Sequence, residues 1–118
     1  MCSSDLTQLE QAFLNLTLNA VEAMPDGGRL IIRSRPLPFR GRGRPTHVLV
    51  RFRDTGVGMS AEQRDRAFAA LLSSTKPKGT GLGLAIVARV VETHQGVVRL
   101  KSRPGGGATF TIVLPCVP

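Results

Sequence analysis

Asp54-Thr55-Gly56-Val57-Gly58-Met59 follows residues 47–53, in which Val48, Val50 and Phe52 alternate with Leu49, Arg51 and Arg53 and so fall on one face of a strand. That alternation predicts a strand with one buried face, and the strand ends at Asp54. A carboxylate there can accept a hydrogen bond from an exocyclic amino group, and Gly56 and Gly58 let the backbone approach a flat ring. Adenine carries such an amino group, whereas guanine carries a carbonyl that the carboxylate repels. Asp-Gly turns are also common connections, so an ordinary turn is the alternative.

Helices and strands are predicted on both sides of this turn. From the N-terminus they are a helix over about 5–24, strands over 29–33 and 47–53, helices over about 60–68 and 81–94, and strands over 97–102 and 108–114. Ser60 and Gln63 have the spacing of a capping box at the start of the second helix. This order predicts one α+β domain over residues 1–118: a two-layer α/β sandwich, with helices packed on one face of a mixed sheet.

A polar stripe interrupts the apolar second half of the first helix. Asn15, Asn19 and Glu22 stand at positions i, i+4 and i+7, and Gln11 lies one turn earlier. An asparagine inside a helix costs about 0.5 kcal/mol relative to alanine, so two aligned asparagines need a reason. Their oxygens suit a hydrated magnesium ion and phosphates, because magnesium prefers oxygen ligands and keeps several waters. The alternative is the solvent-facing side of an amphipathic helix.

A glycine-rich stretch, Gly79-Thr80-Gly81-Leu82-Gly83-Leu84, precedes and opens the third helix. Glycines at a helix start leave backbone N–H groups free for an anion, and the helix dipole adds to the attraction. The spacing is neither the Walker pattern nor the dinucleotide fingerprint. Lys76 and Lys78 lie upstream, in a stretch of about 69–79 that lacks clean periodicity and is expected to be mobile. That stretch is a candidate lid over phosphates.

Together these three stretches resemble, in order, the N, G1 and G2 boxes of histidine kinase catalytic domains. The counterpart of the N box is Asn15-Leu16-Thr17-Leu18-Asn19-Ala20, and residues 101–110 resemble the last strand pair of the same family. The resemblance covers residues from about 9 to 115, and it looks closest to nitrogen-regulator-type sensor kinases, whose short lid runs into a segment like Thr75-Lys76-Pro77. It implies the Bergerat ATP-binding fold shared with gyrase, MutL-type repair proteins and heat-shock chaperones.

The resemblance further implies the ATP-binding catalytic domain of a bacterial two-component sensor histidine kinase, with ATP and Mg²⁺ as cofactors. Asn19 would then hold the metal ion, and Asp54 would read the adenine amino group. The implied catalytic residues are Asn15, Asn19 and Lys76. The implied nucleotide-binding residues are Asn19, Glu22, Asp54, Gly56, Gly58, Lys76, Gly79, Thr80, Gly81, Leu82, Gly83 and Thr109.

Asn15 indicates a kinase rather than a hydrolase. In ATPases of this superfamily, a glutamate one helical turn before the metal-binding asparagine activates water. Asn15 holds that place here, and a carboxamide cannot take a proton at neutral pH. Negligible ATP hydrolysis is therefore expected.

The phosphate-accepting histidine of the family is expected on a separate dimerising helical domain. His94 ends the third predicted helix and His47 begins a strand, so both are interpreted as structural or surface residues. The expected partners are that histidine-bearing dimerisation domain and a response-regulator receiver domain. The isolated chain is expected to be a monomer that does not phosphorylate itself. Two positions depart from the family: the stretch 68–76 lacks the aromatic pair of the usual lid, and Gln95 replaces a glycine.

The composition of the chain indicates which partners and which location to expect. Sixteen basic and eight acidic residues give a net charge of +8, which indicates an anionic partner. No run of apolar residues is long enough to span a membrane, and two cysteines give no disulfide framework, so a cytoplasmic domain without membrane contact is expected. Five phenylalanines without tryptophan or tyrosine make a poor platform for stacked bases, so no nucleic acid is expected.

Two alternative functions remain open from the sequence, and one loop has two interpretations. An anti-sigma-type protein-serine kinase shares the implied fold, and a basic nucleic-acid-binding module would account for the charge. A loop rich in proline, glycine and arginine is predicted over about 35–45, between the first two strands. The basic residues in and beside it, Arg33, Arg35, Arg40, Arg42 and Arg44, are either solvated or a contact for an acidic partner such as a receiver domain.

Overall fold

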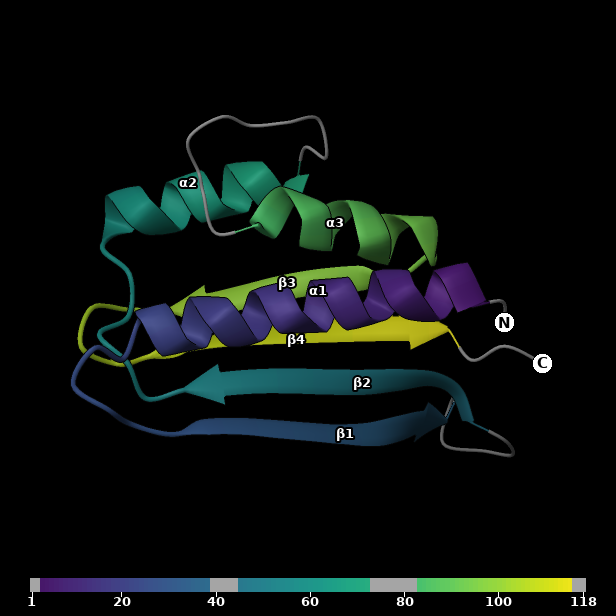
Figure 1. Ribbon diagram of the computed structural model, residues 1–118, viewed down its shortest axis with the longest axis horizontal. Coiled ribbons are helices and arrows are strands. Elements are labelled where there is room, and N and C mark those ends of the chain that lie inside the picture. The colour runs from purple at the N-terminus through teal and green to yellow at the C-terminus, as the bar shows by residue number, and fades with distance from the viewer. Residues whose placement is uncertain (1–2, 39–44, 73–82, 116–118) are drawn as a thin grey trace.

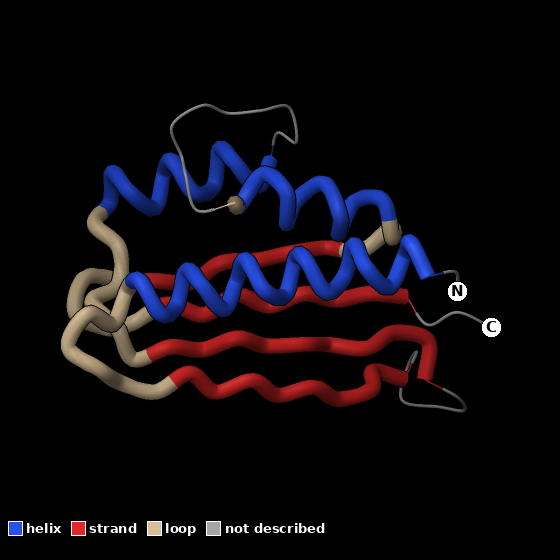
Figure 2. The backbone as a smooth tube through the Cα atoms, viewed as in Figure 1, coloured by secondary structure: helices blue, strands red, loops and turns tan. Residues whose placement is uncertain are grey.

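Seven elements make up the computed structural model, which describes residues 3–38, 45–72 and 83–115. In chain order they are α1 (Ser3–Glu22), β1 (Leu30–Pro38), β2 (Pro45–Asp54), α2 (Ala61–Leu72), α3 (Leu84–Thr93), β3 (Val97–Ser102) and β4 (Ala108–Pro115). The three helices form one layer and the four strands form the other (Figures 1 and 2). The predicted two-layer α+β arrangement is confirmed.

The sheet has the strand order β1-β2-β4-β3, and every neighbouring pair is antiparallel. The prediction of a mixed sheet is therefore wrong for the described strands. The connection through α2 and α3 does return β3 parallel to β2, but β4 turns back from β3 and lies between the two. Because both neighbours of β4 are antiparallel to it, the parallel relation never becomes a hydrogen-bonded pair.

Strand alternation separates a buried face from an exposed one. Phe52 of β2 and Phe110 and Ile112 of β4 are buried beneath the helices, and Leu16 of α1 and Val87 of α3 complete this core. On the other face, Arg51 and Arg53 of β2 and Arg99 and Lys101 of β3 are exposed. The predicted assignment of Val48, Val50 and Phe52 to one strand face is confirmed by this pattern.

Several element boundaries differ from the prediction. β1 runs on to Pro38, because Pro36 sits opposite Val48 on an edge strand, where a residue without an N–H is tolerated. The predicted capping box is confirmed: Ser60 N–H donates to Gln63 Oε1 at 2.9 Å, and Gln63 N–H donates to Ser60 Oγ at 3.1 Å. α2 continues to Leu72 and so includes residues expected in the lid.

The C-terminus of α3 closes with two backbone hydrogen bonds. Gly96 N–H donates to Val91 O at 2.8 Å, and Gln95 N–H donates to Glu92 O at 2.9 Å. This is the bonding pattern of a Schellman motif, which puts a left-handed residue directly after the C-cap. Gln95 occupies that position with φ of 60°. A side chain therefore stands where the backbone favours glycine.

We predict that Gln95→Gly stabilises the protein by about 0.5–1 kcal/mol, because relief of the left-handed conformation outweighs the added freedom of the unfolded chain. Urea unfolding checks this as a higher midpoint with an unchanged slope. A lower midpoint would show that the Gln95 side chain contributes more than its backbone costs.

None of the described helices is both long and apolar enough to cross a membrane.

Candidate functional site

Asp54 is a buried carboxylate at the end of β2, with only 6% of its surface exposed. Its Oδ1 atom accepts hydrogen bonds from Gly56 N–H at 2.8 Å and from Ala108 N–H at 3.3 Å. Its other oxygen, Oδ2, makes no hydrogen bond with the described residues. The two backbone donors thus fix the orientation of the carboxylate and leave one oxygen available as an acceptor.

The turn after Asp54 is clamped between α1 and the β3–β4 turn. Val57 N–H donates to Ala23 O just beyond α1, at 3.0 Å, while Val57 O accepts from Gly105 N–H at 2.7 Å. Gly58 has φ of 72°, and a Cβ atom there would collide with the carbonyl oxygen of Arg103. The turn therefore needs a residue without a side chain at this position.

The asparagine stripe of α1 faces the start of α3. Asn15 Nδ2 donates to Gly83 O at 3.4 Å, and Asn15 Oδ1 accepts from Gln11 Nε2 at 3.2 Å. Asn19 Nδ2 is buried and has no hydrogen-bond partner among the described residues. Since a buried polar group without a partner costs about 1–3 kcal/mol, Asn19 Nδ2 is poised to donate a hydrogen bond to a ligand. Glu22, at the end of the stripe, is exposed.

The start of α3 approaches the same stripe. Gly83 is the N-cap in a left-handed conformation, with φ of 68°, and no side chain caps the helix. A Cβ atom at Gly83 would lie 2.7 Å from Asn15 Nδ2, so the backbone packs directly against the stripe. The first N–H groups of a helix lack intrahelical partners and favour an anion.

α1 thus connects the two ends of the candidate site. Gly83 contacts α1 at Asn15, and the turn after Asp54 contacts the chain at Ala23, with Asn19 midway. At 1.5 Å per residue, Asn15 and Ala23 are about 12 Å apart along the helix. The site therefore has a carboxylate at one end, a helix start at the other and an unpartnered amide between them.

Not every predicted site residue joins this cluster. Thr109 is paired with Arg53, one position from the Asp54–Ala108 pair, so its side chain lies on the opposite face of the sheet. The structure therefore does not bring Thr109 together with Asp54, contrary to the expectation. Lys76, Gly79, Thr80, Gly81 and Leu82, as well as the Thr75-Lys76-Pro77 segment, lie outside the described residues.

Two groups at the site carry no signal in the sequence. The backbone N–H of Ala108 holds Asp54 only because the register places those two residues side by side. Ser102 links the turns: Met59 N–H donates to its Oγ at 3.0 Å, and its hydroxyl donates to Gly107 O at 2.9 Å. Asp54, by contrast, could be found from sequence because it ends a strand before two glycines.

His94 lies apart from this site. Its Nδ1 bonds Val90 O at 2.8 Å at the C-terminus of α3, which requires that nitrogen to be the protonated donor. Its Nε2 is buried with no partner among the described residues. The position supports the structural interpretation of His94.

Over residues 4–118 the chain matches the family described as Histidine kinase-, DNA gyrase B-, and HSP90-like ATPase, and it belongs to this family. Sensor histidine kinase ZraS of Klebsiella oxytoca is 45% identical over 112 residues, which are 95% of this chain and 23% of ZraS. Sporulation kinase E of Bacillus subtilis (strain 168) is 38% identical over 108 residues, 92% of this chain and 14% of that kinase. The chain therefore spans well under a third of these relatives.

Solved structures of histidine kinases share the fold. The mycobacterial sensor histidine kinase MprB superposes with a TM-score of 0.69 at 33% identity, covering 100% of this chain and 74% of that one. Full-length ShkA in complex with AMPPNP gives a TM-score of 0.69 at 30% identity, covering 92% of this chain and 21% of that one. The resemblance to histidine kinase catalytic domains and the Bergerat fold are thereby confirmed.

Proposed function

We propose that this chain is the ATP-binding catalytic domain of a sensor histidine kinase, which presents the γ-phosphate of Mg-ATP to a histidine on another domain. The observation that carries the proposal is the buried Asp54 carboxylate, with Oδ1 held by two backbone N–H groups and Oδ2 unbonded among the described residues. The family and the kinase names of the relatives support it.

The base would bind at the Asp54 end of the site. Oδ2 is an acceptor without a donor, so it favours a base edge that offers an amino group. Adenine offers one, whereas the guanine carbonyl would face the carboxylate and be repelled. The turn after Asp54 would border the ring, since Gly56 and Gly58 bring backbone rather than side chains to this edge.

The phosphates and Mg²⁺ would bind at the other end, between Asn19 and the start of α3. Described residues include no cluster of three or more His, Cys, Asp or Glu side chains suited to a metal ion. A magnesium ion would instead be bound by the Asn19 amide oxygen, by phosphates and by water. Magnesium suits such a site because it retains waters and binds phosphate oxygens. When bound, the ion would neutralise the charge that develops on the transferred phosphate.

The phosphate acceptor would come from another part of the parent protein. His94 is engaged with Val90 O, which leaves no imidazole at the site among the described residues. A histidine-bearing dimerisation domain and a receiver domain are the partners that this proposal requires. Lys76 and residues 79–82 remain candidates for phosphate contacts, and the chain remains proposed as one domain of a longer kinase.

Asn19→Ala is predicted to remove the magnesium dependence of ATP binding. In the unaltered protein, Mg²⁺ should tighten ATP binding about tenfold, because Asn19 is the protein's ligand to the ion. Calorimetric titrations with and without Mg²⁺ measure this ratio, with Leu18→Ala on the exposed side of α1 as the control. An Asn19→Ala variant that keeps the ratio would contradict the proposed role.

We also predict negligible ATP hydrolysis by the isolated chain, because Asn15 supplies no base for water. Phosphate release should stay far below about one turnover per second, the low end of typical enzyme rates. A faster, magnesium-dependent turnover that disappears in Asn19→Ala would instead indicate an ATPase.

A further inference from the structure

The face of the sheet turned away from the helices, called here the outer face, carries six cations. Arg33 and Arg35 of the predicted arginine-rich loop belong to strand β1, while Arg40, Arg42 and Arg44 lie outside the described residues. The outer-face cations are Arg33, Arg35, Arg51, Arg53, Arg99 and Lys101. Asp54 is the sole carboxylate in the described strands, and it is buried on the helix side.

These cations have no counterions within the described structure. Among the described residues, the structure shows an ion pair between Arg66 and Glu62, and both of these residues lie on α2. Arg33 and Arg51 are even direct cross-strand partners, an arrangement of like charges that destabilises a sheet. The outer face therefore holds positive charge that an external anion would compensate.

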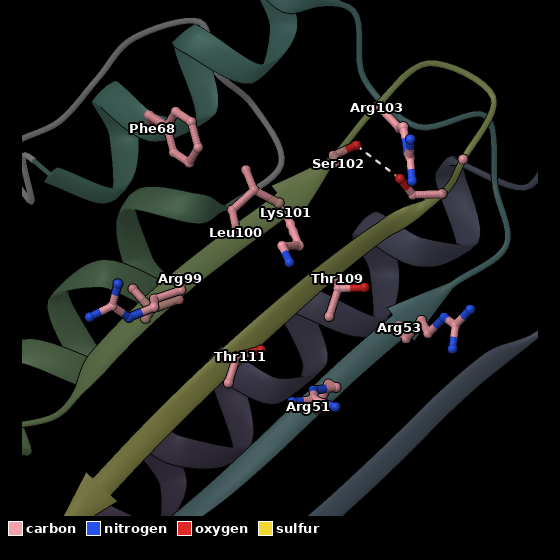
Figure 3. Close-up of a pocket in the computed structure, with 13 residues that line it drawn as sticks. Arg51, Arg53, Phe68, Arg99, Leu100, Lys101, Ser102, Arg103, Thr109 and Thr111 are labelled. Carbon is pink, nitrogen blue, oxygen red and sulfur yellow. Dashed lines mark hydrogen bonds between the residues drawn. The ribbon is translucent and has the colours of Figure 1, made fainter.

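The register arranges four of the cations around two threonines. Thr111 lies between Arg51 and Arg99, and Thr109 lies between Arg53 and Lys101. Because neighbouring strands are about 4.8 Å apart, the two columns of cations stand about 10 Å apart with the shorter threonines between them. These six side chains line a hollow of about 1130 Å³. Figure 3 shows them on the sheet, with α1 behind it.

An apolar row adjoins the cations on the same face. Leu49, Val113 and Val97 are in register across β2, β4 and β3, directly beside the row of Arg51, Thr111 and Arg99. Val97 is 48% exposed. The outer face thus combines arginine, a residue enriched at protein interfaces, with an apolar strip that a partner would cover.

We propose that the outer face binds an acidic protein surface whose carboxylates lie beside apolar side chains. Carboxylates placed over Thr109 and Thr111 would meet cations from both sides, and the apolar row would cover the neighbouring residues. A second copy of this chain is a poor occupant, because its net charge is also +8.

A nucleic acid fits the outer face less well. A phosphate backbone offers nothing apolar to cover the strip of Leu49, Val113 and Val97. The outward positions of the described strands hold no Phe, Trp or Tyr for stacking bases, and Phe68 lines the hollow only from α2. The outer face is also opposite the side on which Asp54 and Asn19 lie, so the partner and a nucleotide can be bound together.

Fluorescence anisotropy with three labelled probes of equal charge tests the proposal. The first probe is a short peptide of three valines followed by four glutamates, the second has serines in place of the valines, and the third is a single-stranded oligonucleotide. The valine peptide should bind about fivefold more tightly than the serine peptide. Val97→Ser should remove most of that preference, because Val97 is the most exposed part of the apolar row.

The double variant Arg51→Gln/Arg99→Gln should bind the valine peptide about tenfold more weakly than the unaltered protein does. The matched control is Arg66→Gln/Arg89→Gln, which removes the same charge from α2 and α3 and should change binding less than about twofold. All four positions are exposed, so both double variants should melt at about the temperature of the unaltered protein.

Three outcomes would overturn the proposal. Equal weakening by the control would show that only net charge matters. Tighter binding of the oligonucleotide, lost in Arg51→Gln/Arg99→Gln, would identify a nucleic-acid surface. Equal binding of both peptides, unchanged by Val97→Ser, would leave the apolar row without a role.

Discussion

Asp54→Asn is expected to weaken ATP binding about 100-fold. Oδ1 of Asp54 accepts from two backbone N–H groups, so the amide oxygen of an asparagine must occupy that place. The amide nitrogen then replaces Oδ2 and presents hydrogens to the adenine amino group. The loss of a charge-assisted hydrogen bond, with a donor now facing a donor, corresponds to about 2–3 kcal/mol. Calorimetric titration with Mg-ATP measures the change.

The control for this experiment is Asp65→Asn, an exposed carboxylate on α2 whose replacement changes the net charge by the same amount. It should leave the ATP affinity within about twofold, because exposed charges contribute little. Circular dichroism should show Asp54→Asn folded, since both hydrogen bonds to Oδ1 are retained. Unchanged ATP affinity in a folded Asp54→Asn protein would place the base elsewhere.

Gly58→Ala is expected to destabilise the fold by about 3 kcal/mol. Gly58 combines a left-handed backbone, which costs a side chain about 1–2 kcal/mol, with a Cβ position blocked by the Arg103 carbonyl oxygen. The methyl group would push apart the two turns that Val57 and Gly105 join. Urea unfolding measures the loss as a lower midpoint.

Gly105→Ala distinguishes the cost of the left-handed backbone from the cost of the collision with the Arg103 carbonyl. Gly105 has φ of 76°, close to that of Gly58, but no atom lies within 4 Å of its Cβ position. Its substitution should therefore cost only about 1 kcal/mol, the backbone share of the effect. Equal losses at Gly58 and Gly105 would show that the contact with Arg103 contributes nothing.

The local features of the fold followed from sequence because they depend on neighbouring residues. The capping box at Ser60 and the alternation along β2 are set within a few residues, and both are confirmed. The parallel or antiparallel character of the sheet depends on where β4 inserts, which no local pattern specifies. The prolines of β1 indicated a loop because their tolerance depends on the strand being at an edge.

The candidate site also contains residues that local sequence predicts and residues that depend on the tertiary structure. Asn15, Asn19 and Asp54 were predicted because each residue type is unusual for its local position, and the structure places them along one path beside α1. Thr109 was misplaced because a shift of one residue in a strand reverses the face, and the register to Asp54 is a tertiary property. The Ala108 N–H could not be predicted for the same reason.

A calorimetric titration of the unaltered protein with Mg-ATP beside Mg-GTP tests the adenine site at Asp54 most directly. If Asp54 reads the amino group of adenine, ATP should bind saturably at one site and GTP should bind at least about 50-fold more weakly, a difference of about 2.3 kcal/mol. Equal binding of the two nucleotides, or binding of neither by the folded protein, would contradict an adenine site at Asp54.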